Sequence, residues 1–219
     1  MASPTTNTPH KKNPAKTLWI GVGAALTLVV VIAAIIAFAG GESTKPVTSL
    51  PTEVEEFRPV TVTGEALPKM AEGDDPAVGI QAPQLDGSTF DGSAITIKPG
   101  EPTLVVLLAH WCSHCQREVP RLVKWNNEGG VPEGVEIVGI ATATDSKNPN
   151  FPPSAWLARE AFPWPVLVDS AKQEAAAALG LSAFPTFVFL DAEGKVLFRA
   201  SGEVEMSALR EMIVDTMGT

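Results

Sequence analysis

Short runs of apolar residues alternate with polar, turn-rich segments from Gly79 to the end of the chain. One of them, Leu104 to Ala109, is uninterrupted, as expected for a central strand that is buried on both faces. The other runs predict further strands at Val135–Ala141, Val166–Val168, Thr186–Leu190 and Lys195–Arg199. Asp191-Ala192-Glu193-Gly194 separates the last two strands and predicts a hairpin turn.

Helical patterns lie between these strands. From Ser113 to Asn126, Val119, Leu122 and Val123 form an apolar stripe, and Pro120 is expected to kink the helix. Further helices are predicted at Ser154–Ala161, at Ala171–Leu179, which Gly180 should end, and at Met206–Met217. Strands that alternate with helices in this way predict an α/β domain.

A different apolar segment lies near the start of the chain. No charged residue occurs from Thr17 to Gly41, and Leu18 to Phe38 is almost wholly apolar. About twenty apolar residues suffice to cross a bilayer as a helix, whereas a helix in a soluble core usually carries a polar face. A cleaved signal peptide is the alternative, because Ala37-Phe38-Ala39 resembles a cleavage site, but its apolar core would normally run only about 7–15 residues. We therefore expect an uncleaved single-pass membrane anchor.

Charge is distributed unevenly about this segment. Lys11, Lys12 and Lys16 precede it, so the positive-inside rule puts the N-terminus in the cytoplasm and the rest of the chain outside. All 25 acidic residues follow it, with 13 of the 16 basic residues, so the part expected to be exported carries a net charge of about −12. This acidic balance argues against nucleic-acid binding.

Together these patterns divide the chain into four parts. They are a cytoplasmic tail at 1–16, a transmembrane anchor at 17–39, a linker at 40–74 with a possible short strand at Pro59–Thr63, and the α/β domain at 75–219.

The candidate chemistry lies in Trp111-Cys112-Ser113-His114-Cys115, which contains the only two cysteines of the chain. Two thiols in this spacing can close a small disulfide ring with little backbone movement. A strand precedes them and a helix follows, so Cys112 falls at a helix N-terminus, where unpaired backbone N–H groups favour the thiolate. This arrangement favours a reversible dithiol/disulfide couple.

Two structural interpretations of the cysteine pair are weaker. A structural zinc site needs four ligands, and the only histidines besides His114 are His10, in the tail, and His110. A purely structural disulfide is also possible, but so short a loop constrains the unfolded chain very little.

The order of these elements, with Phe184-Pro185-Thr186 before the hairpin, resembles the thioredoxin fold, a central mixed sheet flanked by helices. More narrowly, it is similar to the membrane-anchored TlpA/ResA-like thiol-disulfide oxidoreductases over roughly residues 75–218. The matching motifs are GIQAPQLDGSTF, WCSHCQREVP, FPWPVLVD and AFPTFVFLDAEGKV. The resemblance implies that Phe184-Pro185 is a cis peptide bond facing the cysteines, where the substrate backbone docks beside Thr186.

The resemblance also implies roles for single residues. Cys112 would be the exposed attacking thiol and Cys115 the buried resolving thiol. Glu118 matches the acidic residue that family members carry near the disulfide, and its spacing from Cys115 allows contact on one helix face. The alternative for Glu118 is a solvated helix residue. Trp111 is expected either to pack beside the disulfide or to be an ordinary core aromatic residue.

The chain departs from the thioredoxin pattern at two points. Thioredoxins carry a buried Asp six residues before the first cysteine, and Val106 occupies that position here. The dipeptide between the cysteines is Ser-His, which resembles the Cys-Pro-His-Cys of periplasmic oxidases. We expect His114 to offer a hydrogen bond or partial positive charge to the Cys112 thiolate, which would make the couple more oxidising.

These observations predict an extracytoplasmic enzyme that exchanges disulfides with exported proteins through Cys112 and Cys115. It would need no metal and no cofactor beyond the redox-active Cys112–Cys115 disulfide, and a membrane electron-transfer protein is a further candidate partner. The alternative is a copper metallochaperone or redox-linked assembly factor for respiratory proteins. Such relatives use Cys-x-x-x-Cys with a distant His, whereas no histidine follows His114 here. The direction of electron flow stays open.

Overall fold

The computed structural model describes residues 56–71 and 73–217. The predicted tail, the predicted anchor and most of the predicted linker lie outside the described residues. Within the described ranges, none of the helices is both long enough and apolar enough to cross a bilayer.

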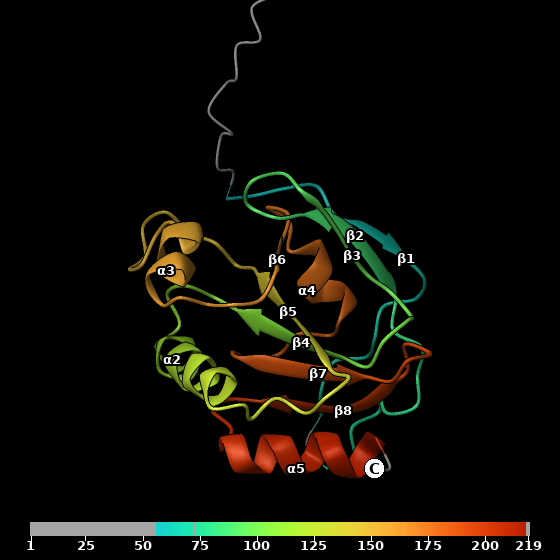
Figure 1. The fold of residues 1–219 in the computed structure, drawn as a ribbon. Coiled ribbons are helices and arrows are strands. Elements are labelled where there is room, and N and C mark those ends of the chain that lie inside the picture. Colours follow the sequence, from blue (N-terminus) through green and yellow to red (C-terminus); the bar gives the residue numbers. More distant parts are fainter. Residues whose placement is uncertain (1–55, 72, 218–219) are drawn as a thin grey trace, which may run out of the picture. The chain divides into compact units, whose positions relative to one another are not determined.

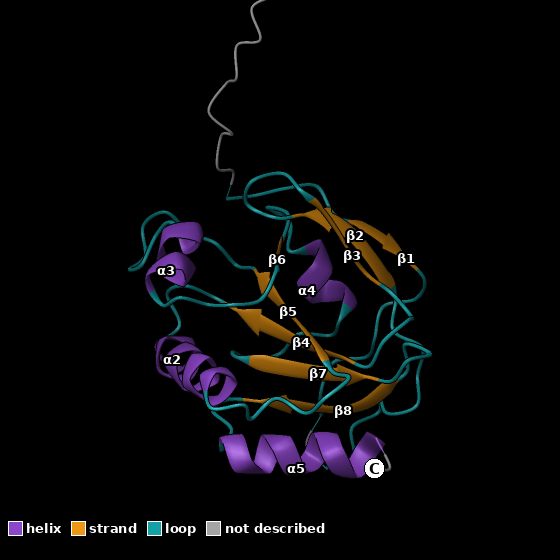
Figure 2. Cartoon of the chain, viewed as in Figure 1, coloured by secondary structure: helices purple, strands orange, loops and turns teal. Residues whose placement is uncertain are grey.

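A mixed five-stranded sheet forms the centre of the domain (Figures 1 and 2). Its strands, in spatial order, are β6 (Val166–Val168), β5 (Glu136–Ala141), β4 (Thr103–Leu108), β7 (Thr186–Leu190) and β8 (Val196–Ser201). The first three run parallel to one another, whereas β7 is antiparallel to both β4 and β8. All six residues of β4 are buried, as the continuous apolar run predicts.

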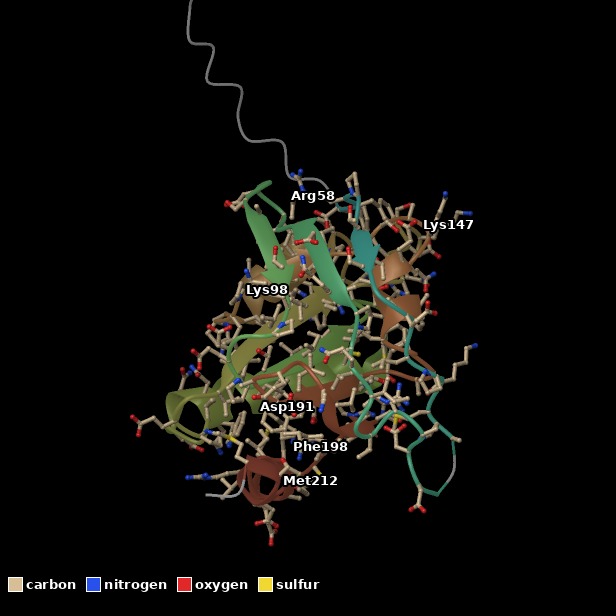
Figure 3. The ribbon with its side chains drawn as sticks, turned by 90° about the vertical axis from the view of Figure 1, so that its right-hand side faces the viewer. Arg58, Lys98, Lys147, Asp191, Phe198 and Met212 are labelled. Atoms are coloured by element: carbon tan, nitrogen blue, oxygen red, sulfur yellow. The ribbon has the colours of Figure 1, made fainter. Side chains whose placement is uncertain are left out.

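The two faces of the sheet are covered by different elements. Leu104, Val106 and Leu108 of β4 belong to the core cluster that includes residues of α2 (Ser113–Asn127), α3 (Pro153–Arg159) and α5 (Met206–Met217). Figure 3 labels Phe198 on β8 and Met212 on α5, and both pack against this cluster. The site elements β4 and α2 therefore share one core.

The other face of the sheet packs on α4 (Glu174–Ala178) and on a small antiparallel sheet (Figure 1). Val105 and Leu107 of β4 point to this side, because successive side chains alternate across a strand. The small sheet contains β1 (Thr61–Thr63), β2 (Gln84–Ser88) and β3 (Ala94–Ile97), paired in that order. The prediction of a mixed central sheet flanked by helices is thus confirmed.

Most of the predicted elements are confirmed to within one or two residues, but one helix start is wrong. We expected a helix from Ala171, whereas α4 begins at Glu174. Ser170 to Gln173 forms a turn instead, with the Gln173 amide donating to the Ser170 carbonyl (2.8 Å) and Gln173 at φ 58°. α2 continues through the exposed residue Pro120 to Asn127.

Candidate active site

The cysteine motif lies where β4 ends and α2 begins. Cys112 is the N-cap of α2, with extended backbone angles, and its Sγ accepts a hydrogen bond from the Cys115 amide at 3.5 Å. The Cys112 amide donates to the Ala109 carbonyl (3.1 Å), which ties the turn to the end of the strand. The sulfur thus occupies the place of an N-cap oxygen, where backbone N–H groups and the helix dipole favour a thiolate.

The two thiols differ in accessibility, although less than expected. Both cysteines are free, with Cys115 fully buried and Cys112 8% exposed. The expectation of an exposed Cys112 is therefore wrong in degree, because the Phe184 carbonyl lies over the sulfur and accepts its hydrogen bond at 3.8 Å. Burial raises the pKa of the Cys115 thiol well above its ordinary value, and the nearby charges of Cys112 and Glu118 raise it further. Cys112 is the more accessible of the two.

The segment from Phe184 to Thr186 approaches the motif from the neighbouring strand. The Phe184–Pro185 peptide bond is cis, as the resemblance implies. Thr186 begins β7 directly opposite Leu107 of β4, and its hydroxyl donates to the Ala183 carbonyl at 2.7 Å. Pairing of β4 with β7 therefore brings Phe184-Pro185 to the cysteines, 72 residues after Cys112.

Trp111 forms the edge of the site. Its residue is 37% exposed, so the interpretation as a core aromatic residue is wrong. Its ring meets that of Phe184 edge to face, with centroids 5.8 Å apart, and its indole N–H donates to the Ala143 carbonyl at 2.7 Å. The half-exposed indole is thus held by the Phe184 ring and by the Ala143 carbonyl, and it provides an apolar surface beside Cys112.

Glu118 is buried, so the interpretation as a solvated helix residue is wrong. Its side chain has no exposed surface and accepts hydrogen bonds from Arg121 Nη1 (2.8 Å) and from the Val204 amide (3.0 Å). Burial raises the pKa of the Glu118 carboxyl above its ordinary value of 4.5, while the Val204 amide and the Arg121 charge oppose that shift. A carboxyl in this state can take up and release a proton nearer neutral pH than an exposed one.

His114 is placed differently from our expectation. Its side chain is 57% exposed, and its Nδ1 lies 2.7 Å from Glu203 Oε1 and 2.9 Å from Arg117 Nη2. The imidazole therefore pairs with Glu203 instead of donating to the Cys112 sulfur, and the predicted direct contact is wrong. The reason is tertiary, since Glu203 follows β8, 89 residues later in the chain.

Sequence reasoning missed two residues at this site. Glu203 gave no local signal, because its partners are distant in sequence. His110 is almost completely buried and ties the motif to the loop after β5, with Nδ1 2.7 Å from the Pro149 carbonyl and Nε2 accepting from the Asp145 amide at 3.2 Å. Its position two residues before Cys112 was the only hint of this role.

The described residues show no metal cluster at the thiols, and two cavities of the domain lie away from them. Among the described residues, no group of three or more His, Cys, Asp or Glu side chains is arranged to hold a metal ion. Two open cavities of about 410 and 660 Å³ lie between the β2–β3 turn and α3, and neither is lined by Cys112 or Cys115.

Comparison with known proteins places this geometry in a family. The Redoxin family model matches residues 63–213, which is more than half of the chain. The chain belongs to the Redoxin family. Together with its two cysteines, this membership makes it a thiol-disulfide oxidoreductase of the thioredoxin superfamily. No protein of curated function matches the chain significantly.

Several solved structures share the fold seen here. StoA from Bacillus subtilis is 20% identical, with a TM-score of 0.51. The match covers 63% of this chain and 98% of the StoA chain. A thiol:disulfide interchange protein from Chlorobium tepidum is 22% identical with a TM-score of 0.52, covering 67% and 100%. A secreted disulfide oxidoreductase from Mycobacterium tuberculosis is 20% identical with a TM-score of 0.50, covering 59% and 94%. At these identities the likeness shows the thioredoxin-like fold.

Proposed function

We propose that this protein exchanges disulfides with exported proteins, through Cys112 as the attacking thiol and Cys115 as the resolving thiol. The observation that carries the proposal is the position of Cys112. Its sulfur caps α2 and contacts the carbonyl of Phe184 before cis-Pro185, while Cys115 is buried one turn inside the helix. A partner's sulfur can therefore reach Cys112 first.

In the reducing direction, the Cys112 thiolate attacks one sulfur of a partner disulfide. A Cys112–partner disulfide forms, and the other partner sulfur leaves as a thiolate that takes up a proton. Cys115, after losing its proton, attacks the Cys112 sulfur, so that the Cys112–Cys115 disulfide forms and the second partner sulfur leaves. Two electrons pass from the protein to the partner, and no organic cofactor takes part. The oxidising direction is the reverse.

Glu118 is proposed as the proton acceptor for Cys115. Burial raises the pKa of Cys115, so this thiol needs a base before it can attack. Glu118 follows it by one helical turn and is buried with it, and its charge is one of those that act on the thiol. Val106 cannot supply this base, because it is apolar.

The surroundings of Cys112 favour a macromolecular partner. Trp111 and Phe184 present an open aromatic surface beside the sulfur. An extended partner segment could lie along this surface, next to cis-Pro185. We take this partner to be an exported protein thiol or disulfide, with electrons exchanged in turn with a membrane protein.

Trapping of mixed disulfides tests the roles of the two thiols. Cys115→Ser removes the resolving thiol, so we expect partners to accumulate as disulfides to Cys112, visible as slower bands on non-reducing gels that vanish on reduction. Cys112→Ser is the matched control and should trap none. Trapping by Cys112→Ser alone would reverse the roles, and trapping by neither variant would contradict the proposed function.

The location is a separate proposal that rests on the lysine-flanked segment Leu18–Phe38. A reporter that is active only outside the cytoplasm should be active when fused after Thr219, and should lose activity when fused after Lys16. The protein should stay in the membrane fraction after alkaline extraction. Activity of a cytoplasm-only reporter fused after Thr219 would contradict this topology, and a soluble form beginning near Gly40 would show that the segment is cleaved.

A further inference from the structure

The segment Gly202–Val204, between β8 and α5, contacts three separate parts of the site. The Gly202 amide donates to the carbonyl of Pro185 (2.8 Å), in the segment proposed to dock the partner. The Val204 amide donates to Glu118 Oε1 (3.0 Å). Between them, Glu203 reaches the first turn of α2. This segment is thus fixed by its backbone on both sides of Glu203.

Glu203 binds two basic side chains at the start of α2, Arg117 and His114. Its Oε1 accepts from Arg117 Nε (2.9 Å) and Arg117 Nη2 (2.5 Å), and lies 2.7 Å from His114 Nδ1. We assign the Nδ1 proton to the Glu203 contact, because a carboxylate can only accept. The 2.9 Å approach of Arg117 Nη2 to the same nitrogen is then a close contact of two groups drawn to one oxygen.

The contacts between Glu203 and Arg117 favour the charged form of both side chains. Hydrogen bonds first from Arg117 and then from His114 lower the pKa of Glu203 to about 2, so it is ionised throughout the neutral range. The pKa of Arg117 is raised, first by its hydrogen bond to Glu203, and the charge of the Cys112 thiolate adds to that shift. Arg117 lies near the start of α2, the helix that Cys112 caps, so its positive charge belongs to the same end of the helix as the Cys112 sulfur.

We propose that Glu203 is a positioning residue that makes the Cys112–Cys115 couple more reducing, by neutralising Arg117 and holding His114 away from the Cys112 sulfur. The inference rests on the proposed thiol exchange. Without this carboxylate, the positive charge of Arg117 would act uncompensated on Cys112. A nearby positive charge stabilises the thiolate and hence the reduced form, and a stabilised reduced form is a stronger oxidant.

Equilibration with glutathione tests this inference on the intact chain in detergent. The protein dithiol reacts with glutathione disulfide to give the protein disulfide and two molecules of glutathione, so two electrons and two protons leave the protein. We expect Glu203→Gln to lower the equilibrium constant for this oxidation roughly three- to tenfold, where tenfold corresponds to about 30 mV. The free energy of unfolding, measured in urea, separates this effect from loss of the fold.

Two further variants decide whether the effect acts through the proposed contacts. Glu205→Gln is the matched control, because Glu205 is an exposed acidic residue two positions after Glu203 and pairs with Arg121 at 3.0 Å. It should leave the equilibrium constant within twofold of wild type. In Glu203→Gln with Arg117→Gln, the constant should return most of the way to the wild-type value, because the uncompensated cation is gone.

The outcomes separate this inference from the proposed function. If wild type equilibrates with glutathione but Glu203→Gln leaves the constant unchanged, the role of Glu203 is refuted and the exchange function stands. An equal shift in Glu205→Gln would also refute it, because net charge alone would then explain the change. If wild-type Cys112 and Cys115 do not equilibrate with glutathione at all, the proposed function itself fails.

Discussion

Glu118 shows how much the environment of one side chain decides. It lies on the buried face of α2 with Cys115 and Val119, in a stripe that would otherwise be apolar. Arg121 and the Val204 amide satisfy its two oxygens, so the burial is compensated by hydrogen bonds. Its raised pKa is the property that a base for the buried Cys115 requires.

We expect Glu118→Gln to slow the resolution step on the order of 10²-fold at neutral pH, the lower end of what a positioned general base contributes. The rate of wild type should rise through an apparent pKa above 4.5, and the variant should lack that rise. Stopped-flow measurement of the tryptophan fluorescence change during exchange, from pH 4 to 9, gives both quantities. Glu128→Gln, an exposed substitution near the end of the same helix, should keep the wild-type profile.

The same carboxyl gives a stability prediction of definite sign. Because its pKa is higher in the folded than in the unfolded chain, the folded state binds more protons, and its contribution to stability falls as pH rises from 4.5 through the raised value. Urea unfolding should show this fall in wild type and not in Glu118→Gln. Identical pH dependence in both proteins would contradict the raised pKa.

At the scale of elements, α4 shows why one boundary was predicted incorrectly. The helical pattern begins at Ala171, but the observed helix begins at Glu174. The side chain that caps it is Asp169, directly after β6. Its carboxylate accepts hydrogen bonds from the amides of Ala175 (2.9 Å) and Ala176 (3.1 Å) and from the hydroxyl of Thr142 (2.7 Å). The first turn therefore forms where Asp169 can reach it.

Asp169→Ala should lower the free energy of unfolding by about 2–4 kcal/mol, because a helix cap is lost and the buried Thr142 hydroxyl loses its partner. Lys172→Ala, an exposed change in the same turn, should stay within about 0.5 kcal/mol of wild type. Urea unfolding measures both values. A loss of under 1 kcal/mol for Asp169→Ala would mean that water or a rearranged turn replaces the cap.

At the scale of the whole domain, one buried ion pair attaches the segment before β2 to the central sheet. Arg199 of β8, whose side chain is fully buried, donates to Asp75 through Nε (2.8 Å) and Nη2 (2.5 Å). Its Nη1 donates to the carbonyls of Pro68 (2.9 Å) and Leu179 (3.0 Å). One guanidinium thus holds together the segment before β2, β8 and the end of α4.

Asp75→Ala should destabilise the domain by about 3–5 kcal/mol, since it leaves a buried guanidinium without its counter-ion. Asp74→Ala removes an exposed neighbour and should cost little. The hydrogen bond from Arg199 lowers the pKa of Asp75, so this stabilisation is present above pH 3.8 and is lost as pH falls through the lowered value. Acid unfolding followed by circular dichroism should show this loss in wild type and Asp74→Ala, and not in Asp75→Ala.

Features that depend on neighbours in sequence could be predicted from the chain alone. The buried strand at Leu104–Ala109, the helix that follows and the spacing of Cys112 and Cys115 are all local, because one strand and one helical turn determine them. The same holds for the hairpin around Asp191–Gly194. The sequence by itself therefore determined the fold class and the place of the two cysteines in it.

Only the tertiary structure decided what surrounds those thiols. Pairing of β4 with β7 carries Phe184 over Cys112, and the chain after β8 brings Glu203 to His114, 89 residues away. The imidazole therefore pairs with a carboxylate instead of the sulfur, which no local pattern could reveal. Contacts between distant segments set burial and charge, and burial and charge set how readily each thiol reacts.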